Sequence, residues 1–184
     1  MERGAASYAS SPIALRTALR PGCSVMAEHG ARFTAAIVRP PAASFAQGLT
    51  TAGLGAPDLS AALSQHAAYV AALEQLGVRV TALPPDTAFP DSTFVEDTAV
   101  VTAQGAIAAR PGAPSRAGEV AAIRAALVAR LGSVAAISAP GTLDGGDICQ
   151  ADRTFFVGLS HRTNEEGARQ LTEWLGRAGY TSSI

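Results

Sequence analysis

The stretch FPDSTFVEDTAVV places three carboxylates close together: Asp91, Glu96 and Asp97. Such a group of acids caps a helix, lines a solvated loop or binds a cation. A loop that binds a hard metal ion usually alternates Asp and Asn around a turn glycine, whereas apolar residues interrupt these acids. A guanidinium fits better, because carboxylates grip its planar N–H groups and an aromatic ring covers its face. From spacing alone, a solvated loop without a ligand is an equal alternative.

Two arginines lie where predicted strands turn into helices. Arg116 ends the stretch RPGAPSR, and Arg162 lies within GLSHRTN. An arginine in such a turn, beside the free N–H groups of a helix N-terminus, is a natural receptor for a carboxylate. Acids in one loop and arginines in two others predict a site for both ends of a zwitterionic amino acid with a cationic side chain. The alternative is that both arginines form surface ion pairs, which contribute little energy.

The elements that must position these loops alternate regularly from Phe33 onward. Helices are expected at 59–76, at 116–131 and after Thr163, with Asp58 capping the first and Thr163 with Glu166 forming a capping box at the third. Strands are expected at residues 33–38, 78–83, 98–103, 105–110, 133–138, 147–151, 154–158 and 180–184. Short strands around each helix predict an α/β fold built from a repeated ββαβ unit, and such units do not bury their faces alone.

Length and composition suit one folded domain of 184 residues with 48% apolar and 16% charged residues. A net charge of −1 argues against nucleic acid or a membrane surface as partner. The two cysteines lack the spacing of a disulfide framework, which favours a cytoplasmic location. We expect residues 1–30 to be an N-terminal extension, disordered or read from a misassigned start, with Met26 as the alternative first residue, and residues 31–184 to be the folded part.

Four stretches together resemble a known family. They are DSTFVEDTAVV, RPGAPSR, LDGGD and FVGLSHRTNEEGARQL, and their order and distances are similar to those of dimethylarginine dimethylaminohydrolase, a member of the guanidino-group-modifying (pentein) superfamily. The resemblance runs from about Phe33 to the C-terminus. It implies the N-terminal part of a five-bladed α/β propeller, incomplete in this chain. It also implies hydrolysis of N-omega-methylated arginine to citrulline and methylamine or dimethylamine, without a cofactor or a metal.

The resemblance implies a role for each candidate residue. Glu96 and Asp97 would hold the guanidinium, and Asp91 would bind the α-amino group. Arg116 and Arg162 would bind the α-carboxylate.

Further roles fall on the stretches FAQGLT and LDGGD. Leu49 would close over the substrate, and Asp144 would orient the catalytic histidine. Gly145 and Gly146 would let the backbone approach the ligand. The resemblance places the family's catalytic histidine and nucleophilic cysteine outside this sequence, and Cys149 is expected to be a small buried residue.

Three functional interpretations follow. The chain is the N-terminal part of a dimethylargininase, inactive alone, or a non-catalytic module that binds an arginine analogue, or another guanidino-modifying enzyme such as an arginine deiminase or an amidinotransferase. The sequence FVED argues against the last of these. Because an incomplete propeller exposes the flanks of its outer units, association with a second copy or with a complementary chain is also expected.

Overall fold

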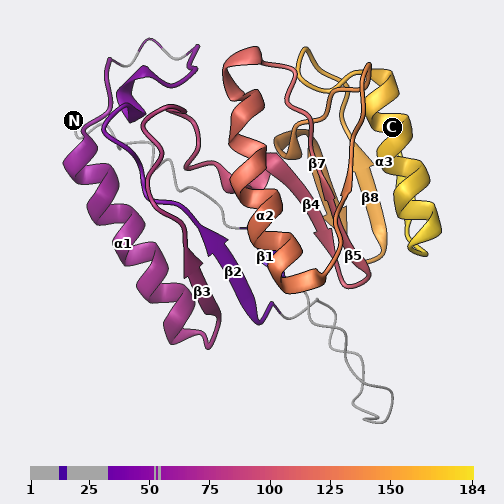
Figure 1. Cartoon of the computed structure of the whole chain (residues 1–184), viewed down its shortest axis with the longest axis horizontal. Coiled ribbons are helices and arrows are strands. Elements are labelled where there is room, and N and C mark those ends of the chain that lie inside the picture. Colours follow the sequence, from indigo (N-terminus) through magenta and orange to yellow (C-terminus); the bar gives the residue numbers. More distant parts are fainter. Residues whose placement is uncertain (1–12, 16–32, 52, 54) are drawn as a thin grey trace, which may run out of the picture.

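The structure, a computed structural model, describes residues 13–15, 33–51, 53 and 55–184. These residues form three successive ββαβ units, each with one three-stranded sheet (Figure 1). In every unit the first two strands are antiparallel, and the third strand follows the helix and runs parallel to the second. The prediction of a repeated ββαβ unit is confirmed.

The bounds of the elements follow the predicted order closely. The first unit contains β1 (Ile13–Leu15), β2 (Ala35–Val38), α1 (Leu59–Gln75) and β3 (Arg79–Ala82). The second contains β4 (Ala99–Thr102), β5 (Gly105–Ala108), α2 (Val120–Leu131) and β6 (Ala135–Ala136). The third contains β7 (Ile148–Ala151), β8 (Thr154–Val157), α3 (Glu165–Arg177) and β9 (Thr181–Ser183). Short 3-10 helices lie in the connections: η1 (Phe45–Gln47), η2 (Val95–Thr98), η3 (Pro114–Glu119) and η4 (Gly145–Asp147).

The first strand comes from the region that the sequence sets apart as an extension. Strand β1 lies within residues 1–30 and pairs with β2 in a register that sets Ile13 opposite Ile37. The rest of that region, including Cys23 and Met26, lies outside the described residues.

Helix caps follow the prediction at α1 but not at α3. Asp58 caps α1 by accepting two backbone N–H groups, as predicted. The prediction of a capping box at Thr163 and Glu166 is wrong. Asn164 is the N-cap of α3, and its side chain accepts a backbone N–H of the first turn. The hydroxyl of Thr163 is instead bonded to the carboxylate of Asp147. The start of α3 is therefore tied to the loop that contains η4.

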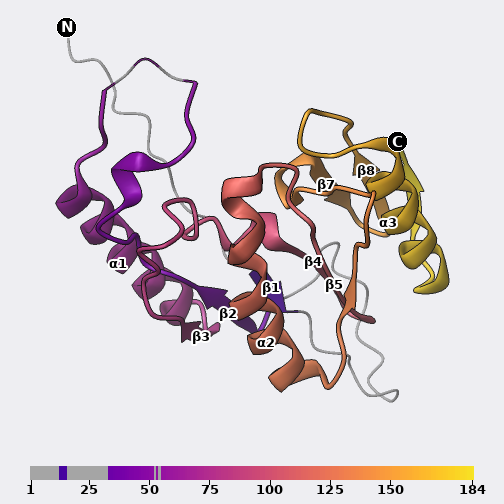
Figure 2. The same cartoon turned by 45° about the horizontal axis from the view of Figure 1, so that its top comes forward.

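Two hydrophobic cores join neighbouring units. The first contains Ile37 of β2 together with Ile123 and Leu127 of α2, and the second contains Ile107 of β5 together with Leu171 of α3. Each fully buried leucine or isoleucine contributes about 1.5–3 kcal/mol relative to an exposed one. The helices follow one another across the molecule in both views, from α1 through α2 to α3 (Figures 1 and 2). The units are thus held in series by shared cores, as the sequence predicts.

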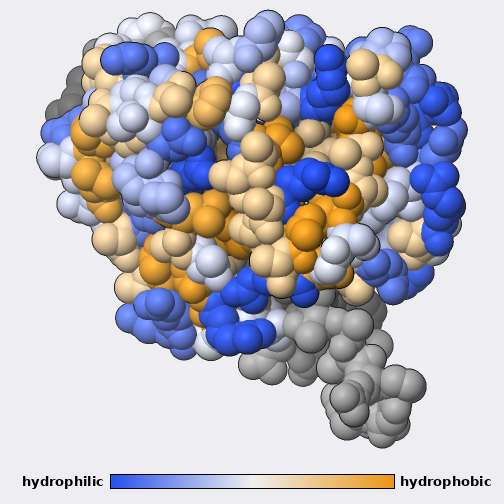
Figure 3. Space-filling model, viewed as in Figure 1, coloured by the Kyte–Doolittle hydropathy of each residue, from blue (hydrophilic) through white to orange (hydrophobic). Residues whose placement is uncertain are grey.

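The surface differs between α2 and α3. In the view of Figure 3, apolar side chains gather in the middle, over α2, and hydrophilic side chains gather over α3 at the right edge. The outer face of α3 carries Glu166, Arg169 and Glu173, which form ion pairs with one another. In the part of the chain that the structure describes, no helix is long and apolar enough to span a membrane.

The expectation that Cys149 is buried is wrong. Its side chain is exposed on β7, opposite Phe156 of β8, which is also exposed. Successive side chains of a strand point to opposite faces, so Ile148 packs toward the second core and Cys149 points away from it.

Candidate functional site

The loop that contains Asp91, Glu96 and Asp97, called the acidic loop below, is held by the two residues that flank its adjacent acids. Val95 and Thr98, at the ends of η2, are both buried, and the hydroxyl of Thr98 donates to the carbonyl of Val95 at 2.7 Å. Glu96 and Asp97 lie between them in the first turn of η2. A helical turn was not predicted here, and it explains why an apolar residue precedes the two adjacent acids: Val95 anchors the loop in the first core.

Glycines bring neighbouring loops against the acidic loop. A Cβ on Gly145 would lie under 3.0 Å from the carbonyl oxygen of Glu96, and a Cβ on Gly118 would lie equally close to the ring of Phe89. Real Cβ atoms essentially never approach so closely, so the backbone of Glu96 leaves no room for a side chain at position 145, and a side chain at position 118 would displace the ring of Phe89. Gly146 also lies beside the acidic loop, where an added Cβ would be 3.2 Å from Asp97 Oδ1. Both glycines thus lie against the acidic loop, and the approach to a ligand that the resemblance implies for them stays a prediction.

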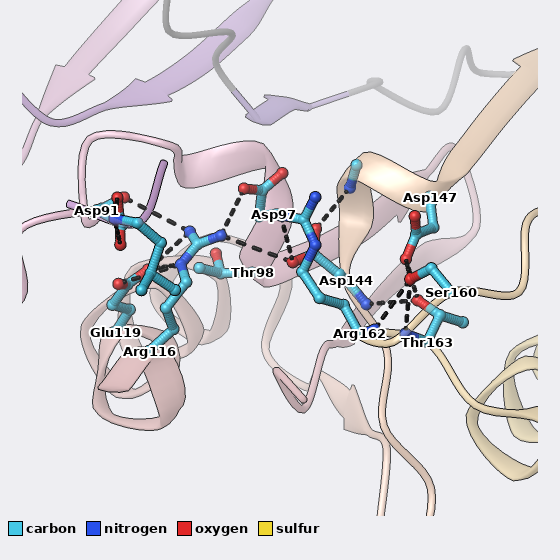
Figure 4. Close-up of polar contacts among 12 residues, drawn as sticks. Asp91, Asp97, Thr98, Arg116, Glu119, Asp144, Asp147, Ser160, Arg162 and Thr163 are labelled. Carbon is cyan, nitrogen blue, oxygen red and sulfur yellow. Dashed lines mark hydrogen bonds and ion pairs between the residues drawn. The ribbon is translucent and has the colours of Figure 1, made fainter. Parts of the chain in front are cut away.

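Arg116 joins the acids of the site (Figure 4). Its side chain is buried in η3, where Nε and Nη2 donate to both oxygens of Glu119 at 2.8–3.2 Å. On the other side, Nη1 donates to Asp97 Oδ2 at 2.7 Å and lies 3.6 Å from Asp144 Oδ2. Nη2 also donates to the backbone carbonyl of Asp91 at 3.5 Å. Burial alone would lower the pKa of Arg116, but the bonds and charges of Glu119 and Asp97 raise it above its ordinary value.

Asp144 lies between the two arginines. Its carboxylate is 1% exposed, and Oδ2 is 3.6 Å from Nη1 of both Arg116 and Arg162. Burial, followed by the charge of Asp97, raises the pKa of Asp144, while Gly146 N–H, Arg162 and Arg116 oppose the shift. Its other oxygen accepts the N–H of Gly146 at 3.0 Å. Within the described residues Oδ2 has no hydrogen bond, so it is available to a ligand or to a partner group.

The loop of Arg162 is fixed by a second carboxylate, Asp147. Oδ2 of Asp147 accepts the hydroxyls of Ser160 and Thr163, both at 2.7 Å. Ser160 in turn accepts the backbone N–H of Arg162 at 2.9 Å, and Thr163 accepts the backbone N–H of Asp144 at 3.0 Å. The network links Arg162 and Asp144 to the carboxylate of Asp147, while the side chain of Arg162 remains 42% exposed.

Asp91 binds the loop that precedes α1. Both of its carboxylate oxygens accept the backbone N–H of Leu49, each at 3.1 Å. A Cβ on Gly48 would lie under 3.0 Å from Asp91 Oδ1, so glycine is required for this approach. The side chain of Leu49 is 62% exposed. The structure therefore connects Leu49 to the site through Asp91.

Five of the candidate residues form one connected group, and Glu96 lies next to Asp97 in η2. Direct contacts join Asp91, Asp97, Arg116, Asp144 and Arg162 into one chain of polar groups. The carboxylate of Glu96 lies close enough to α1 that, after burial, its charge raises the pKa of Tyr69.

Two residues that the sequence did not single out complete the site: Glu119 and Asp147. Glu119 lies three residues after Arg116, a spacing at which side chains meet on a helical turn, and Asp147 is the last residue of LDGGD. The spacing of Glu119 from Arg116 and the place of Asp147 in LDGGD are visible in the sequence. Neither tells whether a carboxylate is buried.

The charges of the site suit an organic cation. The six carboxylates and two arginines of this region carry a formal charge of −4: Asp91, Glu96, Asp97, Glu119, Asp144 and Asp147 against Arg116 and Arg162. A cationic ligand would balance part of this excess, and planar N–H groups would match the carboxylates. Across the described ranges, no group of three or more His, Cys, Asp or Glu residues is arranged to hold a metal ion.

The serial ββαβ units and this site of carboxylates and arginines define an α/β propeller protein of the pentein superfamily. A family model described as N,N dimethylarginine dimethylhydrolase, eukaryotic, matches residues 58–182. The chain belongs to the dimethylarginine dimethylaminohydrolase family.

Individual relatives agree with this assignment. The chain is 48% identical over 150 residues to N(G),N(G)-dimethylarginine dimethylaminohydrolase of Pseudomonas aeruginosa, covering 80% of this chain and 59% of the relative. It is 45% identical to the enzyme of the same name from Streptomyces coelicolor, covering 74% of this chain and 53% of the relative. A solved structure of the Pseudomonas aeruginosa protein in complex with citrulline superposes with a TM-score of 0.80 at 46% identity, over 83% of this chain and 60% of that one. The chain thus spans little more than half the length of these relatives.

Proposed function

We propose that this chain forms the substrate-binding part of a dimethylargininase, which hydrolyses N-omega-methylated arginine to citrulline and methylamine or dimethylamine. The observation that carries the proposal is the continuous contact from Asp97 through Arg116 and Asp144 to Arg162, in a chain of this family. It provides acids and arginines within one site, which is what an amino acid with a cationic side chain requires.

The guanidinium end of the ligand is assigned to Asp97 and Glu96. Asp97 lies in a fixed turn beside Gly145 and Gly146, so its carboxylate has a defined position. A guanidinium is a poor electrophile, and fixed carboxylates that keep it charged and aligned lower the barrier to attack on its central carbon.

The amino-acid end is assigned to Asp91, Arg162 and Arg116. The carboxylate of Asp91 already accepts the backbone N–H of Leu49, and a ligand ammonium beside Leu49 would add a further donor to the same carboxylate. Arg162 is the more accessible partner for an α-carboxylate, since Arg116 is buried and bonded to Glu119 and Asp97. A ligand carboxylate that reaches Arg116 must share Nη1 with Asp97.

Hydrolysis also needs a thiolate nucleophile and a histidine that transfers protons, with a carboxylate to orient the histidine. The buried Oδ2 of Asp144 supports the orienting role. Cys149 is exposed on β7 and His161 is exposed beside Arg162, and neither is in the network of contacts around Asp144 in the described part of the chain. We therefore assign substrate binding and orientation to the acids and arginines of the site, and no catalytic role to Cys149 or His161. Binding of an arginine analogue without turnover is the second candidate function.

The remaining proposals concern the setting of the site. The net charge of −1 supports a free small molecule as the ligand. The two cysteines without disulfide spacing support a cytoplasmic location. Association with a second copy or a complementary chain stays a prediction, which light scattering of the purified protein checks.

Nuclear magnetic resonance titration tests the orientation of the ligand. Asymmetric dimethylarginine should shift the backbone signals of Leu49, Asp97 and Arg162, and its methyl ester, in which the carboxylate is masked, should bind about tenfold more weakly. In Arg162→Met the acid and the ester should bind alike, because the carboxylate has lost its accessible partner. An equal preference for the acid in wild type and Arg162→Met would refute the assignment of Arg162.

A further inference from the structure

The side chain of Glu119 is used entirely to hold one arginine. The residue is 1% exposed, and its carboxylate accepts three hydrogen bonds from Arg116: Nε to Oε1 at 3.2 Å, Nε to Oε2 at 3.1 Å and Nη2 to Oε2 at 2.8 Å. The turn that sets this geometry is η3, where Gly118 packs against the ring of Phe89 and fixes the turn to the acidic loop.

The same pairing occurs on the surface of α3, where it serves as an internal comparison. Arg169 donates from Nε to Glu166 Oε2 at 2.8 Å and from Nη2 to Glu166 Oε1 at 2.6 Å. There the side-chain bonds of Arg169 lower the pKa of Glu166 to about 2, whereas burial raises the pKa of Glu119 despite its bonds to Arg116. A glutamate that binds Nε and Nη2 of an arginine thus occurs in two environments, buried at Glu119 and more exposed at Glu166.

Because Glu119 is buried, its ion pair with Arg116 is a poor source of folding stability. Removing a carboxylate and a guanidinium from water costs energy that their mutual attraction offsets only partly, and apolar replacements of such pairs are often neutral or stabilising. The ion pair therefore needs another explanation than stability. Its geometry supplies one, because Glu119 takes the Nε–Nη2 edge of Arg116 and leaves Nη1 toward Asp97 and Asp144 (Figure 4).

We infer that Glu119 is a positioning residue: it holds Arg116 by one edge, so that the opposite nitrogen fixes Asp97 in the place and orientation needed for a ligand guanidinium. Without Glu119, the freed edge of Arg116 turns toward Asp97 and Asp144, the nearest remaining carboxylates. Asp97 would then be engaged by two nitrogens of Arg116 instead of one, and a ligand guanidinium would compete with it. The ligand part of this inference rests on the proposed function.

A measurement without ligand tests the positioning itself. In wild type, exchange of the Arg116 Nε–H with water should be at least about tenfold slower than that of the Arg169 Nε–H, which also donates to a glutamate but is exposed to solvent. In Glu119→Gln the Arg116 Nε–H should lose this protection, and the carboxyl carbon signal of Asp97 should move. The matched control Glu166→Gln should change Arg169 and its neighbour Gln170 and leave Arg116 and Asp97 unchanged. A protected Arg116 and an unmoved Asp97 signal in folded Glu119→Gln would overturn the inference, even if the variant melts at a lower temperature.

A second variant covers the case in which Glu119→Gln does not fold. Glu119→Asp keeps the charge but withdraws the carboxylate by one methylene, so Arg116 should stay protonated with intermediate protection and an intermediate shift of the Asp97 signal. Rapid exchange of the Arg116 Nε–H in wild type, at the rate of Arg169, would overturn the inference without any variant.

Binding of asymmetric dimethylarginine extends the test to function. Affinity should fall about tenfold in Glu119→Gln and stay unchanged in Glu166→Gln. Unchanged affinity in Glu119→Gln would contradict the inference. If wild type does not bind dimethylarginine, the proposed substrate fails, and the exchange and carboxyl measurements still decide whether Glu119 positions Asp97.

Discussion

Gly145 lies against the backbone of Glu96, so close that a Cβ at position 145 would come within 3.0 Å of the Glu96 carbonyl oxygen. This contact presses η4 against η2 and sets Asp144 of the third unit beside Asp97 of the second. The site thus depends on a contact between two backbones as well as on its charged side chains.

Gly145→Ala should therefore destabilise the chain by about 1–3 kcal/mol, because an overpacked backbone contact forces the two loops apart. The control is Gly176→Ala in α3, where an added Cβ meets nothing within 4 Å and alanine favours the helix by roughly 0.5–1 kcal/mol. Urea denaturation of both variants measures the difference. Equal stability of Gly145→Ala and wild type would show that the loops do not need this contact.

Gly48→Ala should weaken the binding of dimethylarginine by about tenfold, since the new methyl group displaces the Asp91 carboxylate from the N–H of Leu49. Gly53→Ala, whose Cβ would meet nothing within 4 Å, should bind like wild type. Calorimetric titration of both variants compares them directly. Identical affinities would remove Asp91 and Leu49 from the site.

The raised pKa of Asp144 predicts a pH-dependent stability. The unfolded chain releases this proton near pH 4, whereas burial and then Asp97 keep the proton on the folded chain to higher pH. The folded state binds more protons in this interval, so the contribution of Asp144 to stability is present below about pH 4 and is lost as pH rises through the folded pKa. Asp144→Asn should therefore gain stability relative to wild type as pH rises from about 4 to 8. A difference that stays constant in urea denaturation across this range would disprove the shift.

Cys149→Ser should leave ligand affinity unchanged, because the thiol is exposed on β7 and outside the contacts of the site. The thiol of Cys149 should react freely with a colorimetric thiol reagent.

The purified 184-residue chain should form no citrulline from dimethylarginine. Turnover that Cys149→Ser abolishes would make Cys149 the nucleophile and contradict this assignment.

The order of elements could be read from the sequence because strand and helix periodicities and caps such as Asp58 are local signals. The start of α3 could not be read from the sequence. The hydroxyl of Thr163 bonds to Asp147 and does not cap the helix, and only the folded chain brings Asp147 near. Cys149 was misplaced for a related reason. Alternation along β7 shows that one face is buried, but packing against the second core decides which face.

The candidate acids and arginines could be named from their stretches, but Glu119 could not be ranked above Glu166. Each lies three residues from an arginine, and their spacings are those of an ordinary helical ion pair. Burial separates them, and burial of Glu119 depends on η3 packing beside the acidic loop through Gly118 and Phe89. Contacts between loops distant in sequence carry the information that spacing lacks.

The binding of asymmetric dimethylarginine to wild type and Asp97→Asn, measured by isothermal titration calorimetry, tests the central claim most directly. The amide keeps the shape of the carboxylate but loses the charge that pairs with a guanidinium, so saturable binding to wild type should weaken at least about thirtyfold in Asp97→Asn. Glu166→Gln, an exposed carboxylate on α3, should bind like wild type. Absence of binding to wild type, or equal affinities of wild type and Asp97→Asn, would contradict the account that the acidic loop holds the guanidinium.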